Sequence, residues 1–341
     1  MKTNSSIGKQ IAIFLGIIIV LLLLFFLFGD WRQTVLSLKN TNWGTLAFSA
    51  LPLLVGIILM VIVWQRLLPR HLKFWGTFHA TSVGNLISIL TPIPDAALRV
   101  VTTEQGTPIS LTQATASMMV DRIMVTLMRI VSFIIAVSFF AIGKQESGIT
   151  ILVSILLIGT ALWLLFWIAR HPEEAIAKIS RFRRIPYTNQ STVKKTLTDF
   201  VISITETISV RQLFVSLGLF LLIWLVDAIF LWFTLEAMPQ PFSTLNKLAI
   251  IAAMLTVLPP AVPVMIGMYQ GIAVAMLVAV KLMDSGTAVS FSIISQIPQV
   301  VCWFILGIWG YSQTNMQFAD LLADAKEIIN DPTQSDEGQS K

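Results

Sequence analysis

Five charged residues lie within or beside apolar segments, where a charge is rarely kept without a role. They are Asp95, Arg99, Asp121, Arg122 and Arg129. A guanidinium presents paired N–H donors that match a phosphate, so the three arginines together could hold a phosphate group. Arg122 and Arg129 are seven residues apart and share a helix face. Asp95 or Asp121 would then prevent an uncompensated cluster of positive charge.

A purely structural explanation of the same charges stays open. If the hydrocarbon core of this helix is Ile123–Ile142, then Asp121 and Arg122 lie at its cytoplasmic boundary as ordinary ion pairs. Arg129 is harder to explain in this way, because it lies about 9 Å deeper. Arg99 would be a boundary residue of a shallow hairpin.

One further charge, Asp227, stands alone in the apolar run IWLVDAIFLWF. A carboxyl group in that setting can bond across helices, titrate, or pair with one of the arginines. The sequence does not distinguish these three roles, so Asp227 stays outside the predicted site.

The elements that position these charges are two apolar stretches broken by proline, at Asn85–Val101 and Met254–Gly271. Proline cannot donate a backbone hydrogen bond, and a freed backbone group in hydrocarbon costs several kcal/mol unless protein or water satisfies it. Two such breaks in corresponding halves of a chain are a pointer to a transport site. The second break contributes Pro260, Pro263 and Gly267 to the candidate site.

The composition places these elements in a membrane protein. The chain has 341 residues, of which 55% are hydrophobic and 12% are charged, and its mean hydropathy is +0.80. Soluble domains usually carry about 25% charged residues. The sequence therefore predicts an all-α polytopic membrane protein.

Six segments are predicted to cross the membrane, each with the roughly 20 residues that a crossing needs. They are Ile11–Phe28, Trp43–Trp64, Thr112–Ile142, Ile149–Ala169, Leu213–Leu235 and Thr287–Tyr311. The first follows Lys2 and Lys9 without a small-residue cleavage site, so we expect it to be retained. Tryptophans near the predicted ends, at positions 31, 43, 64, 75 and 309, are expected to form interfacial belts and are assigned no ligand.

The distribution of basic residues predicts the orientation. Lys2 and Lys9 place the N-terminus in the cytoplasm, and the basic loop 170–211 is the strongest cytoplasmic signal. Counting crossings from these anchors makes 74–111 and 248–285 two proline-broken re-entrant hairpins that enter from opposite faces, as in a weak inverted repeat. The C-terminus is then cytoplasmic as well.

The predicted domain organisation follows. Residues 1–312 form a single integral membrane domain with halves at about 10–169 and 211–312, joined by the loop 170–211. Residues 313–341 form an acidic cytoplasmic tail that is polar enough to be partly disordered.

Several classes of function are disfavoured. The single cysteine, Cys302, excludes an intrachain disulfide, and the three histidines lack metal-ligand spacing, so no metal and no cofactor is predicted. No Walker A, Rossmann or Gly-x-Ser-x-Gly motif is present. The net charge of +5 is better explained by cytoplasmic loops that face anionic lipid than by nucleic acid.

The stretch from Asn85 to Ile130 resembles the lysylphosphatidylglycerol synthase transmembrane-region family, the flippase-like membrane part of bacterial multiple-peptide-resistance proteins, which also occurs in a stand-alone form. The first family motif corresponds here to Asn85, Pro92, Asp95-Ala96-Ala97, Arg99, Gly106 and Asp121-Arg122. The second, a glycine-rich turn, corresponds to Pro260, Pro263, Gly267 and Gly271. The resemblance covers about residues 10–312.

The chain departs from the family pattern at two charged positions. Gln270 stands where the family has Glu, and Gln296 stands where it has a second Arg. If these two charges normally pair, losing both together avoids an unpaired buried charge. The second half would then have lost part of an ion-pair or substrate role.

The resemblance implies a non-enzymatic, flippase-like lipid transport protein of a bacterial-type cell membrane, handling a phospholipid or another anionic lipid. With only residues 313–341 after the last predicted crossing, lipid lysylation is not expected of this chain alone. The alternative is a scaffold or accessory subunit for a lipid- or glycan-modifying enzyme that docks on the loop 170–211 or the tail. A small-solute or ion transporter using Asp121 and Asp227 is a third hypothesis.

Overall fold

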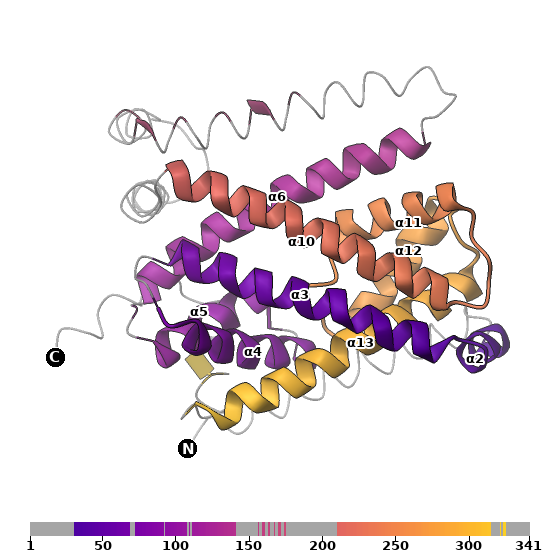
Figure 1. The fold of residues 1–341 in the computed structure, drawn as a ribbon, viewed down its shortest axis with the longest axis horizontal. Helices are drawn as coiled ribbons and strands as arrows, with labels where there is room; N and C mark the ends of the chain where they lie inside the picture. Colours follow the sequence, from indigo (N-terminus) through magenta and orange to yellow (C-terminus); the bar gives the residue numbers. More distant parts are fainter. Residues whose placement is uncertain are drawn as a thin grey trace, which may run out of the picture.

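The chain folds into a bundle of helices, and the residues that the structure describes contain no strand (Figure 1). The structure is a computed structural model that describes residues 31–68, 72–91, 93–107, 109, 111–140 and 210–314, with single residues within 156–174 and 321–324. The predicted crossings 11–28 and 149–169, the loop 170–211 and the tail lie wholly or largely outside these residues. In chain order the described helices are α2 (Trp31–Lys39), α3 (Trp43–Leu67), α4 (Phe74–Leu90), α5 (Asp95–Gly106), α6 (Leu111–Phe140), α10 (Val210–Ala237), α11 (Thr244–Val257), α12 (Met268–Ala279) and α13 (Ser285–Ser312).

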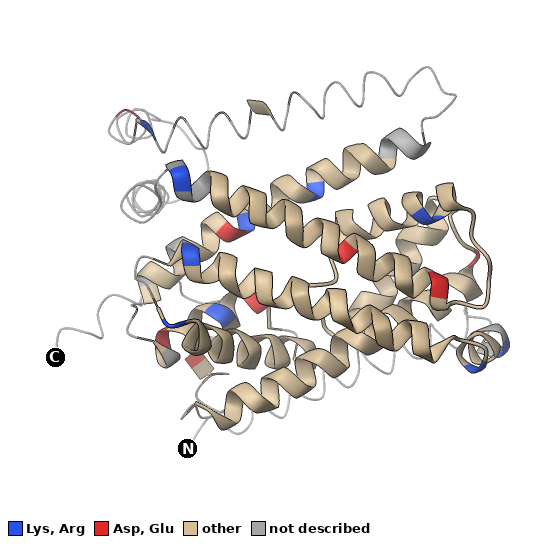
Figure 2. Cartoon of the chain, in the orientation of Figure 1, with Lys and Arg blue, Asp and Glu red and all other residues tan. Residues whose placement is uncertain are grey.

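Three of these helices, α3, α10 and α13, are long and apolar enough to cross a membrane. At 1.5 Å per residue, the 25 residues of α3 extend about 38 Å, more than the ~30 Å hydrocarbon core. The 30-residue α6 is longer still, but it carries three charged residues of the candidate site. Figure 2 shows how few charges interrupt the long helices. These helices confirm the prediction of an all-helical membrane protein.

Side-chain caps fix where three of the helices begin. Asn42 accepts a hydrogen bond from the Thr45 N–H at 3.1 Å, and Ser243 accepts one from the Asn246 N–H at 3.2 Å. Asp284 does the same for the Thr287 N–H at 3.0 Å. Each cap satisfies a donor that the first helical turn leaves free. The Ser243 cap starts α11 at Thr244, four residues before the predicted hairpin boundary at 248.

The first proline-broken stretch is a helical hairpin of α4 and α5, separated by residues 91–94. The two helices approach so closely that a Cβ added at Gly84 would lie 3.3 Å from the main-chain N of Arg99. A larger residue at position 84 would therefore push α5 away. This close approach holds Arg99 against α4 and the bundle interior.

The second proline-broken stretch is a hairpin of α11 and α12, separated by residues 258–267. The break lies at the prolines, as predicted from the sequence, and Pro260 and Pro263 are buried within it. The break ends at Gly267, whose φ of +90° favours glycine.

The two hairpins enter the bundle from opposite ends. The start of α4 lies beside the end of α13. The ring centroids of Trp75, near the start of α4, and Trp309, near the end of α13, are 5.6 Å apart. The α11–α12 hairpin lies at the other end, near the antiparallel pairing of α3 and α10, where the Asn42 N–H donates to the Ala237 carbonyl at 2.8 Å. Figure 1 shows the hairpins on opposite sides of the bundle.

A residue of the C-terminal segment packs onto the first hairpin. Leu321 is fully buried in a cluster with Val83 and Ile87 of α4 and Leu98 and Val101 of α5. Leu321, from the segment predicted to be an acidic tail, thus packs beside the helix that carries Arg99.

Candidate functional site

Four of the five predicted site charges form one ion cluster between α5 and α6. Arg99 Nη1 lies 3.6 Å from Asp121 Oδ2 and 4.0 Å from Asp95 Oδ2. Arg122 Nη2 lies 2.6 Å from Asp95 Oδ2 and 3.5 Å from Asp121 Oδ2. Two guanidinium groups therefore balance two carboxylates. The proline break between α4 and α5 allows this, because it folds Asp95 and Arg99 back toward α6.

Arg99 is the innermost member of the cluster, with a side chain that is only 1% exposed. Its Cζ lies 4.8 Å from the centroid of the Trp64 ring, so the ring face also stabilises the cation. The Nε and Nη2 atoms of Arg99 nevertheless have no hydrogen-bond partner among the described residues. A buried guanidinium with free donors is expected to bind water or an anionic ligand.

Trp64 corrects one expectation from the sequence. It was assigned to an interfacial belt, but its side chain is completely buried, and its Nε1–H donates to Thr103 Oγ1 at 3.1 Å. Trp64 lies near the end of an apolar run and next to basic residues, and this sequence context does not distinguish a ring that faces the interior from one that faces lipid. Trp43, Trp75 and Trp309 are exposed, as belt residues would be.

Arg129 does not join the four-membered cluster. It lies two turns along α6 from Arg122, half-buried, and its Nε has no hydrogen-bond partner among the described residues. The predicted set of three arginines is thus divided into two neutralised cations and one that stands apart.

A face of α4 adds buried polar groups that the sequence-based site did not include. Thr77, Thr81, Ser82 and Asn85 are fully buried, and their side-chain polar atoms lack hydrogen-bond partners among the described residues. Buried polar groups are rarely left unpaired, and ordered water usually satisfies those that protein does not. This face is therefore suited to hold water or polar ligand atoms inside the bundle.

Gln270 of the second hairpin and Gln296 of α13 form an uncharged chain of hydrogen bonds. Gln270 Oε1 accepts from the Gly267 N–H at 2.7 Å, and Gln270 Nε2 donates to Gln296 Oε1. Gln296 Nε2 then donates to the Val264 carbonyl at 3.1 Å. The two glutamines thus pair with each other and close the turn of the second break without any charge.

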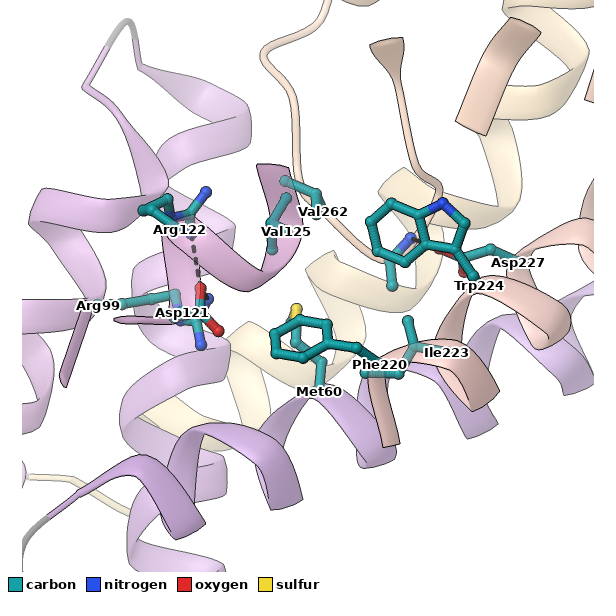
Figure 3. A pocket seen from close by; sticks show the side chains of 11 residues that line it. Met60, Arg99, Asp121, Arg122, Val125, Phe220, Ile223, Trp224, Asp227 and Val262 are labelled. Atoms are coloured by element: carbon teal, nitrogen blue, oxygen red, sulfur yellow. Dashed lines mark hydrogen bonds and ion pairs between the residues drawn. The ribbon is translucent and has the colours of Figure 1, made fainter. Parts of the chain in front are cut away.

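A narrow cavity separates the ion cluster from Asp227. Figure 3 shows Arg99, Asp121 and Arg122 on one side of it and Asp227 on the other, with apolar side chains such as Phe220 between them. The cavity offers about 10 Å³ to the centre of a water molecule, which is room for about one water. This cavity is therefore too small for a lipid headgroup.

No metal centre is apparent in the described part of the chain, because no group of three or more His, Cys, Asp or Glu residues is placed to hold an ion there. The chemistry that the site offers is the binding of anions and of polar hydrogen-bonding groups.

Comparison with known proteins gives one match. Residues 13–307 match the family model described as lysylphosphatidylglycerol synthase TM region. No match was found among curated proteins or among solved structures. The match covers the whole of the ion cluster, both proline breaks and the glutamine pair.

Proposed function

Because the chain belongs to the lysylphosphatidylglycerol synthase transmembrane-region family, we propose that it is a non-enzymatic, flippase-like protein. It moves, or helps to partition, an anionic or zwitterionic phospholipid between the leaflets of a bacterial-type cell membrane. The observation that carries the proposal is the buried guanidinium of Arg99, two of whose nitrogens have no hydrogen-bond partner among the described residues. A phosphate is the ligand that such donors fit best.

In this proposal the headgroup follows the polar interior of the bundle. Its phosphate meets Arg99 and Arg122 by competing with Asp95 and Asp121, and Arg129 supplies a cation that the cluster does not neutralise. The unpartnered groups on α4 replace the water of the headgroup. Because the cavity has room for only about one water molecule, transport requires the two hairpins to separate.

The proposed topology has six crossings, with both hairpins re-entrant and both termini cytoplasmic. Support comes from the opposite ends at which the hairpins enter and from the hydrogen bond at 3.4 Å from the Ile266 N–H of the second break to the Ile89 carbonyl of α4. We propose testing the orientation with Asn246→Cys and Gln313→Cys, each in a Cys302→Ala background, because both positions are exposed. An impermeant thiol reagent applied to intact cells should label Asn246→Cys only, and the reverse pattern would refute the orientation.

The test of transport is leaflet exchange. The purified protein is reconstituted in vesicles that contain a fluorescent phospholipid, and wild type is compared with Arg99→Ala, Arg122→Ala and Arg129→Gln. We expect exchange above that of protein-free vesicles, and a loss of at least tenfold in the arginine variants. Exchange at the protein-free level, in vesicles where a known scramblase works, counts against the proposal.

A second candidate is supported by the pairing within the cluster. Two arginines neutralised by two aspartates, beside a cavity for about one water, also suit a sealed scaffold that supports a lipid- or glycan-modifying enzyme. In that case the protein does not exchange lipid, and substitutions in the cluster reduce its thermal stability without a separate effect on transport.

A further inference from the structure

A buried carboxyl group outside the ion cluster has a setting of its own. Asp227 of α10 is 0% exposed. Its Oδ2 accepts one hydrogen bond, from the Ala261 N–H in the second break, at 3.3 Å. Its Oδ1 is buried and has no hydrogen-bond partner among the described residues. One carboxyl oxygen is therefore bonded to the break and the other is free.

The groups around Asp227 do not neutralise it. On the α3 side, Oδ1 faces Gly56, where an added Cβ would lie a tight 3.3 Å from Oδ1, so the two helices approach closely at this point. Across the cavity lie Arg99, Asp121 and Arg122, whose charges are already paired within the cluster.

None of the remaining titratable groups described on the packed elements pairs with Asp227. Arg129 of α6 is not neutralised by the cluster, but the charges that act on it are those of Arg122 and Asp95. Tyr269 of α12 lies within electrostatic range of Asp227, but its hydroxyl is hydrogen-bonded to Ser295. Lys247 of α11 pairs with Glu236, which lies nine residues, or about 13 Å, further along α10. An ionised Asp227 would thus be a buried charge without a counter-ion, and such groups usually take up a proton instead.

We propose that Asp227 is a proton-binding switch for the second break. In the closed arrangement it is a neutral carboxylic acid, with the proton on Oδ1 and Oδ2 accepting from Ala261. When the cavity opens, water enters, accepts the proton and solvates the carboxylate, and the break moves away from α10. The importance of this switch for lipid movement rests on the proposed function, but the protonation and the movement do not.

The break provides a direct route from Asp227 to the first hairpin. Ala261 and Ile266 belong to the same break, and the Ile266 N–H approaches the Ile89 carbonyl at the end of α4 at 3.4 Å. Because these residues form one short segment held by Pro263, a displacement at Ala261 reaches the contact between the hairpins. Proton release at Asp227 would therefore favour the separation that transport requires.

The first experiment reads the proton directly. Infrared difference spectra of the full-length protein, in a detergent without ester groups, are recorded as the pH is raised. We expect a protonated-carboxyl carbonyl band at neutral pH that disappears in alkali and is absent from Asp227→Asn. Glu236→Gln is the control, since that carboxylate is 43% exposed, and it should keep the band. A wild-type spectrum without the band at neutral pH overturns the proposal, even if the Asn variant does not fold.

The second experiment reads the movement. Val262→Cys, in the Cys302→Ala background, places a thiol on the cavity wall beside Ala261. Labelling by a small soluble thiol reagent should increase at least fivefold between pH 6 and pH 9. Because any thiol reacts faster as the pH rises, this increase is measured relative to the exposed thiol of Gln313→Cys. Adding Asp227→Asn should keep labelling low at every pH. The switch is overturned if labelling of Val262→Cys does not depend on pH, or if it depends on pH equally in the variant that also carries Asp227→Asn.

These outcomes separate the two proposals. A titrating band and pH-dependent labelling without lipid exchange would support the switch and reject transport. Lipid exchange that persists while the band is absent would support transport and reject the switch.

Discussion

The main-chain N of Ile266 in the second proline break lies 3.4 Å from the carbonyl oxygen of Ile89, so the second break contacts the end of α4, just before the first break. Ile89 is the penultimate residue of α4, where the last carbonyls of a helix lack intrahelical partners. The second break thus supplies a donor to a carbonyl at the end of α4. The contact joins segments that are 177 residues apart in sequence and that enter from opposite ends of the bundle.

This contact predicts that a covalent link between the hairpins blocks transport. Because the main-chain N of Ile266 and O of Ile89 are 3.4 Å apart, we expect Ile89→Cys and Ile266→Cys, combined in a Cys302→Ala background, to form a disulfide under mild oxidation. We expect leaflet exchange to fall to the protein-free level on oxidation and to return with reductant. The measurement is exchange in vesicles before and after reduction, with each single cysteine as control. Normal exchange in a fully crosslinked sample would show that the hairpins need not separate.

The glutamine pair predicts a strong dependence between two positions. Gln270→Glu alone places an unpaired carboxylate beside Gln296, and Gln296→Arg alone places an unpaired guanidinium beside Gln270. Each single change should destabilise the protein by about 3–5 kcal/mol, because breaking or leaving unpaired a buried charge is that costly. The double variant should recover most of this loss. Thermal unfolding in detergent measures all four proteins as a double-mutant cycle, and additive losses would contradict the pairing.

The ion cluster predicts that Asp121 and Arg129 differ in their effect on stability. Asp121→Ala leaves the buried guanidinium of Arg99 without its nearer carboxylate and should cost about 3–5 kcal/mol. Arg129→Gln removes no salt bridge of the cluster and should change stability by less than about 1 kcal/mol. The same thermal measurement compares them. Equal losses would mean that Arg129 has a structural partner that the cluster does not provide.

The C-terminal contact predicts a dependence on a single leucine. Leu321 is fully buried against α4 and α5, and Leu→Ala substitutions in packed cores cost about 2–5 kcal/mol. Leu321→Ala should therefore release the segment and increase its cleavage by a protease added to the detergent-solubilised protein. Leu36→Ala, at an exposed leucine, is the matched control. Unchanged cleavage would show that the segment is held elsewhere.

The same contact predicts a dependence on pH. Gln105 Nε2 donates to Asp324 Oδ2 at 2.6 Å, and partial burial together with the nearby Asp324 carboxylate raises the pKa of Glu104. A carboxyl whose pKa is raised by docking favours the docked state while it is protonated, so docking should weaken as the pH rises above the ordinary range of Glu. Asp324→Asn keeps an acceptor for Gln105 but removes the repulsion, and should protect the segment from protease at neutral pH. Faster cleavage of this variant would contradict the assignment.

Much of the architecture could be predicted from the sequence. Runs of about 20 apolar residues located α3, α10 and α13, because only a helix satisfies its backbone hydrogen bonds within hydrocarbon. The prolines located both breaks for the same reason. The charges at 95, 99, 121 and 122 were identified because ionised groups are rare in apolar segments.

Other features depend on contacts between distant segments. Trp64 was misassigned because a ring near a helix end can face lipid or the interior, and only the packing of α5 against α3 decides which. The pairing of Asp95 with Arg122 but not with Arg129 depends on how α5 crosses α6. A local pattern does not encode either crossing.

The class of protein, the long apolar helices, the two breaks and the charged residues could be predicted because they follow from local hydrophobicity and backbone chemistry. The packing of the helices was needed to show which charges neutralise one another, that Gln270 and Gln296 hydrogen-bond to each other, and that Asp227 has no counter-ion among the described residues. The physical reason is that electrostatic energy depends on distance and burial, and both are set by the packing of helices that lie far apart in the chain.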